Sequence, residues 1–126
     1  IYISSMETIV IVDDDQSIHD IWNTRLSDEI TWANLKVLHF YSPEMLIDQY
    51  KNLPKNAKFL IDYEFNNSSL TGLDLMNKLS LYKKSILVTS HYEDNDLNVI
   101  CDKEKVKVIP KTFAIHVPIQ IYDKET

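Results

Sequence analysis

Carboxylate side chains follow two short apolar stretches of this 126-residue sequence. Residues 9–12 run directly into Asp13 and Asp14, and residues 59–61 run directly into Asp62. Apolar runs of this length are typical of strands buried on both faces of a parallel sheet. Ligands of open α/β sheets bind beyond the carboxyl ends of the strands, so acids at these positions are candidates for a functional site. We expect the two strand ends to lie side by side and their acids to share one pocket.

Two further strand ends add polar groups of other kinds. The apolar run 85–89 ends at Thr89, and Lys111 lies just beyond the run 106–109. Carboxylates ~4 Å apart repel by a few kcal/mol at an effective dielectric near 20, so such a cluster needs protons, solvent or a cation. An all-oxygen donor set suits Mg²⁺, which completes its shell with water and phosphate oxygens. With a hydroxyl and a lysine opposite, the site suits a phosphoryl group, and Asp62 is the predicted nucleophile.

The elements that must position these groups alternate along the chain. We expect strands at residues 8–12, 35–41, 58–62, 85–89 and 106–109. Apolar residues at helical spacing predict helices at residues 17–30, 43–53, 72–79 and 94–104, the first of them capped by Ser17. This alternation indicates an α/β fold with a doubly wound, five-stranded parallel sheet covered on both faces.

Composition narrows the classes of function. The sequence is 44% hydrophobic and 25% charged, which is typical of one globular domain. Its formal net charge of −6 argues against direct nucleic-acid binding, which needs a basic face. A single cysteine, Cys101, excludes an internal disulfide and a cysteine-based metal cluster. No apolar run approaches the ~18 residues of a membrane helix, so we expect no membrane segment in this chain.

Five short motifs, in order, resemble those of response-regulator receiver domains. They are Ile-Val-Ile-Val-Asp13-Asp14-Asp15, Phe-Leu-Ile-Asp62-Tyr-Glu, Leu-Thr-Gly72-Leu-Asp-Leu, Ile-Leu-Val-Thr89-Ser90 and Ile-Pro-Lys111. Each motif alone is weak, but five at the ends of successive expected strands are specific. The resemblance covers about residues 8–113 and implies the flavodoxin-like strand order 2-1-3-4-5.

The resemblance implies a role for each acid. Asp62 looks like the phosphoacceptor, Asp14 like a direct ligand of Mg²⁺ or Mn²⁺, and Asp13 like its water-mediated neighbour. The acceptor Asp62 and the backbone carbonyl of Glu64 would complete the protein ligands. These assignments make the metal the expected cofactor.

The resemblance also implies roles for the groups around the acids. Thr89 and Lys111 would contact the phosphoryl oxygens. Glu64 and His91 stand two places after Asp62 and Thr89, where receivers tune the lifetime of the phosphoryl group.

The end of the chain departs from the receiver pattern. Apolar residues at 115, 117, 119 and 121 recur with period two around Pro118, which predicts an extended tail in place of a fifth helix. This domain, a second copy or the rest of a longer protein could cover its apolar row. We therefore expect a receiver domain at residues 6–113 and an extended tail at 114–126. Val108 stands where receivers often carry an aromatic switch residue, so a different readout is expected.

Three functions fit these residues. The first is a phosphorelay receiver that takes its phosphoryl group from a histidine kinase or a histidine phosphotransfer domain. It would switch partner interactions, could homodimerise, and would not be a classical turnover enzyme. The curtailed end resembles receivers of hybrid histidine kinases, which implies a cytoplasmic location, also as the cytoplasmic part of a membrane-bound kinase. The second is a haloacid-dehalogenase-like phosphatase that uses Asp13 as nucleophile. The third is a pseudo-receiver that binds partners without phosphorylation.

Overall fold

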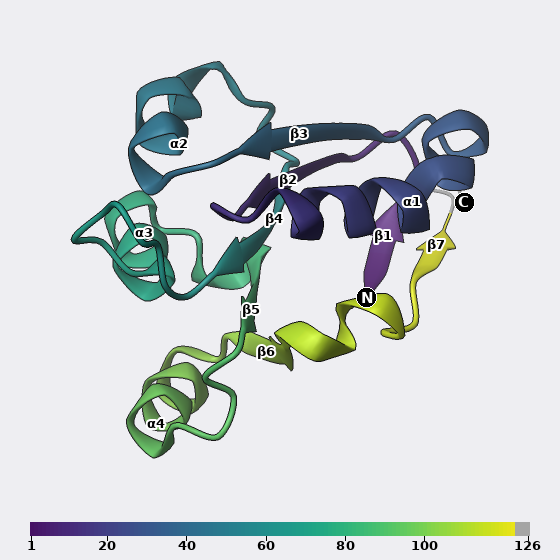
Figure 1. Cartoon of the computed structure of the whole chain (residues 1–126). Coiled ribbons are helices and arrows are strands. Elements are labelled where there is room, and N and C mark those ends of the chain that lie inside the picture. Colours follow the sequence, from purple (N-terminus) through teal and green to yellow (C-terminus); the bar gives the residue numbers. More distant parts are fainter. Residues whose placement is uncertain (123–126) are drawn as a thin grey trace.

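A five-stranded parallel sheet forms the centre of the protein. The computed structural model describes residues 1–122. The strands of the sheet are β2 (Thr8–Val12), β3 (Lys36–Phe40), β4 (Lys58–Asp62), β5 (Ser85–Thr89) and β6 (Lys107–Pro110). Their order is β3-β2-β4-β5-β6 (Figure 1), which confirms the predicted order 2-1-3-4-5 when these five strands are counted along the chain.

Four α-helices cover the sheet, and side-chain alternation along the strands decides which face each helix meets. The helices are α1 (Gln16–Trp32), α2 (Pro43–Gln49), α3 (Gly72–Leu79) and α4 (Asn95–Glu104). Val10 and Val12 of β2 point into the core beneath α2, α3 and α4, whereas Ile9 and Ile11 point into the core beneath α1. Figure 1 shows α1 on one side of the sheet and the other three helices on the opposite side. The predicted doubly wound arrangement is therefore confirmed.

Local capping sets where the helices begin. The Ser42 hydroxyl accepts from the Met45 N–H ahead of α2, and Thr71 and Asp74 form a reciprocal capping box ahead of α3. The predicted cap of α1 is wrong, because Asp15 and not Ser17 occupies that position. The Asp15 carboxylate accepts from the Ser17 N–H at 2.9 Å and from the Ser17 hydroxyl at 2.7 Å.

The two ends of the described chain meet in a second, smaller sheet. β1 (Tyr2–Ser4) pairs in parallel with β7 (Gln120–Tyr122), beside α1 (Figure 1). Val117 is buried in the core beneath α1, and Ile119 and Ile121 pack against it. This domain therefore covers most of the apolar row that the sequence left without a partner.

Between β6 and β7 the chain turns instead of running straight. Residues Lys111–Ile115 form a 3₁₀ helix, η3, so the extended tail predicted from residue 114 is wrong at its start. The Arg25 guanidinium explains the turn, because it donates to the carbonyl oxygens of both Ala114 and Val117. No α-helix follows β6 within residues 1–122, as predicted; the tail residues 123–126 lie outside the described part. No described helix is both long and apolar enough to span a bilayer.

Candidate phosphoacceptor site

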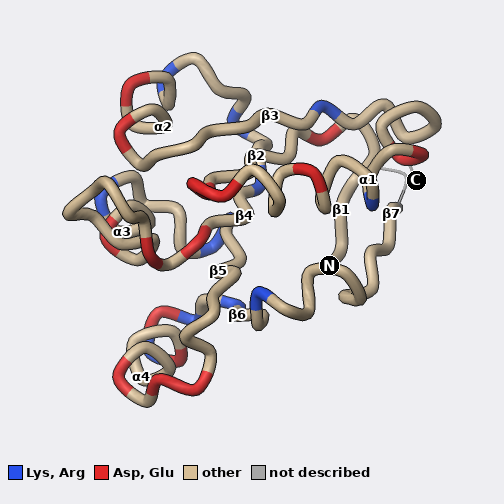
Figure 2. Tube along the Cα trace, in the orientation of Figure 1, with Lys and Arg blue, Asp and Glu red and all other residues tan. Residues whose placement is uncertain are grey.

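The carboxyl ends of β2 and β4 bring three acids together. β2 and β4 are paired so that Val12 lies opposite Ile61, which leaves Asp13 and Asp62 adjacent at the same edge of the sheet. Carboxylate oxygens of Asp13, Asp14 and Asp62 all lie within 4.8 Å of one another. Figure 2 shows the acidic segments that follow β2 and β4 next to each other. The predicted convergence of these strand ends is confirmed.

Lys111 closes this group from the side of β6. It is the first residue of η3, directly after the strand, and its ammonium lies 3.2 Å from Asp13 Oδ2 and 3.2 Å from Asp62 Oδ2. Asp13 and Asp62 are buried, whereas Asp14 is half-buried. One ammonium thus bridges two buried carboxylates, and the third carboxylate remains in contact with solvent.

The buried acids are held in an environment that disfavours their charge. Burial, followed by the charge of Asp13, raises the pKa of Asp62 to about 6, although Lys111 and the Tyr63 N–H act against the rise. Burial also raises the pKa of Asp13, against the N–H of Asp15 and the charge of Lys111. Burial alone would lower the pKa of Lys111, but the attraction of Asp62 and Asp13 outweighs it and raises that pKa. Lys111 therefore stays charged and only partly offsets the negative charge of the cluster.

The single glycine of the chain fixes the backbone around Asp62. Gly72 begins α3, and its N–H donates to the carbonyl oxygen of Tyr63 at 2.7 Å. A Cβ atom at position 72 would lie 2.1 Å from the carbonyl oxygen of Asp62, far inside any real contact distance. The motif around Gly72 thus has a physical reason: the helix can approach the end of β4 only where no side chain intervenes.

A polar cavity of about 610 Å³ opens above the acids, and Asp14, Asp62 and Lys111 line it. Glu64 and His91 stand at its edge and contact each other, with 2.6 Å between Glu64 Oε2 and His91 Nε2. Both side chains are largely exposed. These two predicted tuning residues therefore contact each other where they line the cavity.

Thr89 is the last residue of β5, and its hydroxyl faces the loop that follows the strand. Its side chain is fully buried, and its hydroxyl oxygen accepts from the His91 N–H at 2.8 Å. It lines a neighbouring hollow together with Tyr92 and Lys111, and not the cavity that contains Asp62. The structure thus places Thr89 next to the acidic cluster but turned toward the loop after β5.

Two residues that the sequence did not single out belong to the same cavity. Asn66 and Gln16 line it, and the Asn66 N–H donates to Asp14 Oδ2 at 2.8 Å. The contact is made by a backbone group, so the identity of residue 66 gave no signal.

The donor set fits a hard divalent cation. Three carboxylates from two strand ends offer only oxygen atoms, and one of them, Asp14, is accessible to solvent. Mg²⁺ and Mn²⁺ prefer oxygen ligands and retain several waters, for which the polar cavity leaves room. Lys111 neutralises one negative charge at most, so a cation would relieve the repulsion that remains among Asp13, Asp14 and Asp62.

Sequence comparison and structural comparison give different answers. No protein-family model and no curated protein matches the chain. The structure matches a receiver domain protein from Methanospirillum hungatei at 25% identity and a TM-score of 0.66, over 83% of this chain and 81% of that one. It also matches the receiver domain of the hybrid histidine kinase CckA at 17% identity and a TM-score of 0.60, over 86% of this chain and 88% of that one.

A third match contains a metal. The response regulator TrrA from Thermotoga maritima, solved in complex with Mg²⁺ and BeF, is 14% identical, with a TM-score of 0.63 over 85% of this chain and 88% of that one. The chain spans only 51% of the response regulator StyR, which it also matches. All of these neighbours are response regulators or receiver domains, and the chain has the receiver-domain fold.

Proposed function

We propose that this chain is the receiver of a two-component phosphorelay and that Asp62 accepts the phosphoryl group. The observation that carries the proposal is the bridged cluster of Asp13, Asp14, Asp62 and Lys111 at the carboxyl edge of a receiver-type sheet. A phosphoryl acceptor needs a nucleophilic oxygen beside cationic groups that stabilise charge on the transferred oxygens. Asp62 and Lys111 supply that pair.

In the transfer, an Asp62 carboxylate oxygen attacks phosphorus and forms an acyl phosphate. The bond between phosphorus and the donor imidazole nitrogen breaks, and its electron pair stays on that nitrogen, which takes up a proton. Lys111, 3.2 Å from Asp62 Oδ2, is close enough to hold a phosphoryl oxygen once the product forms. When bound, Mg²⁺ or Mn²⁺ would neutralise charge on the phosphoryl oxygens. Asp13, Asp14, Asp62 and the Glu64 carbonyl would hold it.

Three more residues act around this centre in the proposal. The Thr89 hydroxyl accepts from the His91 N–H at 2.8 Å and still has its own proton to donate to a phosphoryl oxygen, which would connect phosphorylation to the loop after β5. Glu64 and His91, in contact at 2.6 Å, would limit the access of water to the acyl phosphate. These are the residues with which the chain would set the lifetime of its signal.

The proposed donor is a histidine kinase or a histidine phosphotransfer domain. A donor of that kind places the domain in the cytoplasm, either alone or as the cytoplasmic part of a membrane-bound hybrid kinase. One match is the receiver of the hybrid kinase CckA, which supports that origin. In this proposal, residues 6–113 form the phosphorelay unit and residues 114–126 form its tail. Phosphorylation then changes the contacts of the domain with its partners, including its association with a second copy.

Acetyl phosphate with Mg²⁺ tests the acceptor directly, with intact mass as the readout. We expect one phosphoryl adduct on the wild-type chain, none on Asp62→Asn, and none after chelation of the metal. Size-exclusion chromatography of the same samples reports any change in self-association.

Two matched variants separate the alternative functions. Asp15→Asn makes the same chemical change as Asp62→Asn in the same cavity, and asparagine can still cap α1. If the chain is a receiver, this variant should still gain the adduct. A phosphatase that uses Asp13 would instead lose its adduct in Asp13→Asn, retain it in Asp62→Asn and be slowed by Asp15→Asn. A folded chain that forms no adduct under any of these conditions would be a pseudo-receiver, and an adduct unchanged in Asp62→Asn would refute the assignment.

A further inference from the structure

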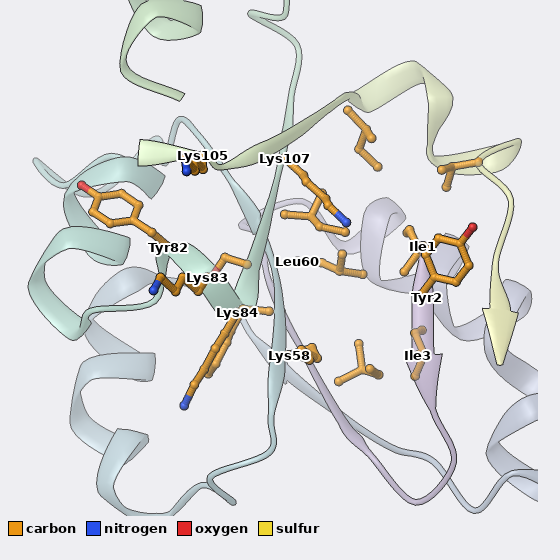
Figure 3. Close-up of a pocket in the computed structure, with 16 residues that line it drawn as sticks. Ile1, Tyr2, Ile3, Lys58, Leu60, Tyr82, Lys83, Lys84, Lys105 and Lys107 are labelled. Atoms are coloured by element: carbon orange, nitrogen blue, oxygen red, sulfur yellow. The ribbon is translucent and has the colours of Figure 1, made fainter. Parts of the chain in front are cut away.

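A second cavity lies at the opposite edge of the sheet, where the strands begin. It has a volume of about 280 Å³. Its floor consists of one aliphatic residue from each of three adjacent strands, namely Leu60, Ile86 and Ile109. Ile3 of β1 and Val117 stand opposite and form a wall. Figure 3 shows this space between the sheet and the segment that contains β1.

The cavity exists because the cover of this face is incomplete. β1, β7 and η3 take the place of a further helix and pack with α1 over the middle of the sheet. Near the starts of β5 and β6 they leave Ile86 and Ile109 only partly buried. An apolar floor therefore stays open to solvent at one edge of the sheet.

Lysines also line this cavity. Lys58 and Lys107 are the first residues of β4 and β6, and alternation puts their side chains on the same face as Leu60 and Ile109. In Figure 3 the Lys107 side chain extends across the cavity on the side of Leu60 and Ile1. Lys83, Lys84 and Lys105 also line the cavity, but in Figure 3 their side chains extend away from Leu60.

The lysines at this edge form no ion pair with the described acidic residues. Five lysines line the cavity, out of 13 lysine and arginine residues in a chain of net charge −6. Within residues 1–122, none of the five has a carboxylate within 4.0 Å; Lys84 instead donates to the Lys55 carbonyl oxygen at 3.2 Å. An apolar cavity with an unpaired cationic rim suits an anion that carries an apolar body.

We propose that this cavity binds an aliphatic carboxylate, a fatty acid of medium chain length. The alkyl chain would lie on Leu60, Ile86 and Ile109, and the carboxylate would pair with Lys107 and Lys58 at the rim. The three floor residues are aliphatic and offer no hydrogen-bonding group, which favours an alkyl chain over a sugar; Tyr2, Phe59 and Tyr82 line other parts of the cavity. The volume of about 280 Å³ is just below the ~300–1,000 Å³ that is typical of ligand pockets, which limits the length of the alkyl chain.

Isothermal titration calorimetry with hexanoate, octanoate and decanoate, below their micellar concentrations, tests the proposal. Each added pair of buried methylenes should tighten binding roughly tenfold until the cavity is full. Octanoate should bind at least tenfold more tightly than octanol, and octylamine should not bind. Lys107→Glu should weaken octanoate binding at least tenfold, whereas the control Lys78→Glu, an exposed lysine on α3, should leave it unchanged.

A substitution that fills the cavity separates binding there from adsorption elsewhere. Ile86→Phe adds volume to a partly buried floor position, and it should abolish octanoate binding while thermal unfolding shows that the variant is folded. Equal binding of octanoate, octanol and octylamine, or octanoate binding unchanged in both Ile86→Phe and Lys107→Glu, would overturn the proposal. So would binding to anionic phospholipid vesicles without binding to octanoate, because the rim would then recognise a membrane surface. The inference does not depend on phosphorylation of Asp62, which lies at the other edge of the sheet.

Discussion

Replacing Asp62 by asparagine should stabilise the metal-free protein at neutral pH, although it removes the proposed acceptor. Burial, and then the charge of Asp13, raises the pKa of Asp62 from 3.8 to about 6. Between these two values the folded chain retains a proton that the unfolded chain has released. Stability must therefore fall as pH rises through this interval, and it stays low above it. The shift corresponds to roughly 3 kcal/mol at pH 7, at about 1.36 kcal/mol per pH unit.

Asparagine has almost the same shape and carries no charge, so it avoids this penalty. Thermal unfolding in EDTA between pH 4 and pH 8 measures the difference between the two chains. We expect them to be alike near pH 4, and Asp62→Asn to be more stable above pH 6.5 by up to about 3 kcal/mol, or roughly 10 °C in Tm. The control Asp28→Asn, an exposed acid on α1, should stay within about 0.5 kcal/mol of wild type at every pH.

Added Mg²⁺ should reverse this ranking, because a cation stabilises the charged form of Asp62. The wild-type Tm should rise with Mg²⁺ concentration, and the Tm of Asp62→Asn should rise much less. Two results would refute the reasoning. One is a wild type at least as stable as Asp62→Asn at pH 7.5 in EDTA; the other is a stability difference that persists unchanged at pH 4.

Three further substitutions test the framework of the site. Gly72→Ala places a methyl group 2.1 Å from the Asp62 carbonyl oxygen, so we expect a loss of about 1–3 kcal/mol in urea unfolding and slower phosphorylation; a wild-type midpoint would contradict the close contact. Lys111→Gln removes the bridging cation, so the pKa of Asp62 from a carboxyl ¹³C titration should rise above about 6; a value at or below 6 would be contrary to this expectation. Arg25→Ala releases two carbonyl oxygens after β6 and should cost about 2–4 kcal/mol, with faster hydrogen exchange in η3, whereas unchanged exchange would argue against the clamp.

The carboxyl edge of the sheet could be predicted because few physical rules determine it. The runs 8–12, 58–62 and 85–89 are apolar and bounded by polar residues, and the strands have these same limits. Parallel pairing then forces their carboxyl ends onto one edge. The meeting of Asp13 and Asp62 thus follows from sequence pattern and topology, without knowledge of any side-chain contact.

The ends of the chain could not be predicted in the same way. β1 has only three residues, and its partner β7 begins at Gln120, so no local pattern reveals the pairing. The period-two row after residue 114 predicts one extended segment, but Arg25, distant in sequence, holds the chain in a turn there. The hydrogen bond from the His91 N–H to the Thr89 hydroxyl could not be predicted from the sequence either. Contacts between remote segments, and choices among side-chain rotamers, leave little trace in a single sequence.

The strand direction of the sheet explains why the two charged sites do not cancel each other. Every strand of the large sheet runs the same way, so the carboxyl ends carry Asp13 and Asp62 and the amino ends carry Lys58 and Lys107. A five-residue strand separates its ends by roughly 15 Å, and surface charges are screened over about 8 Å at physiological salt. The lysines at the amino edge therefore stabilise the buried carboxylates very little.

Lys111, which follows β6, is the cation that contacts Asp13 and Asp62 within the described residues. Its single positive charge cannot neutralise the negative charges of Asp13, Asp62 and Asp14 together. The acidic edge thus retains an excess of negative charge, which is why it should bind a divalent cation. The lysines at the amino edge, which have no carboxylate partner within residues 1–122, remain available to an anion.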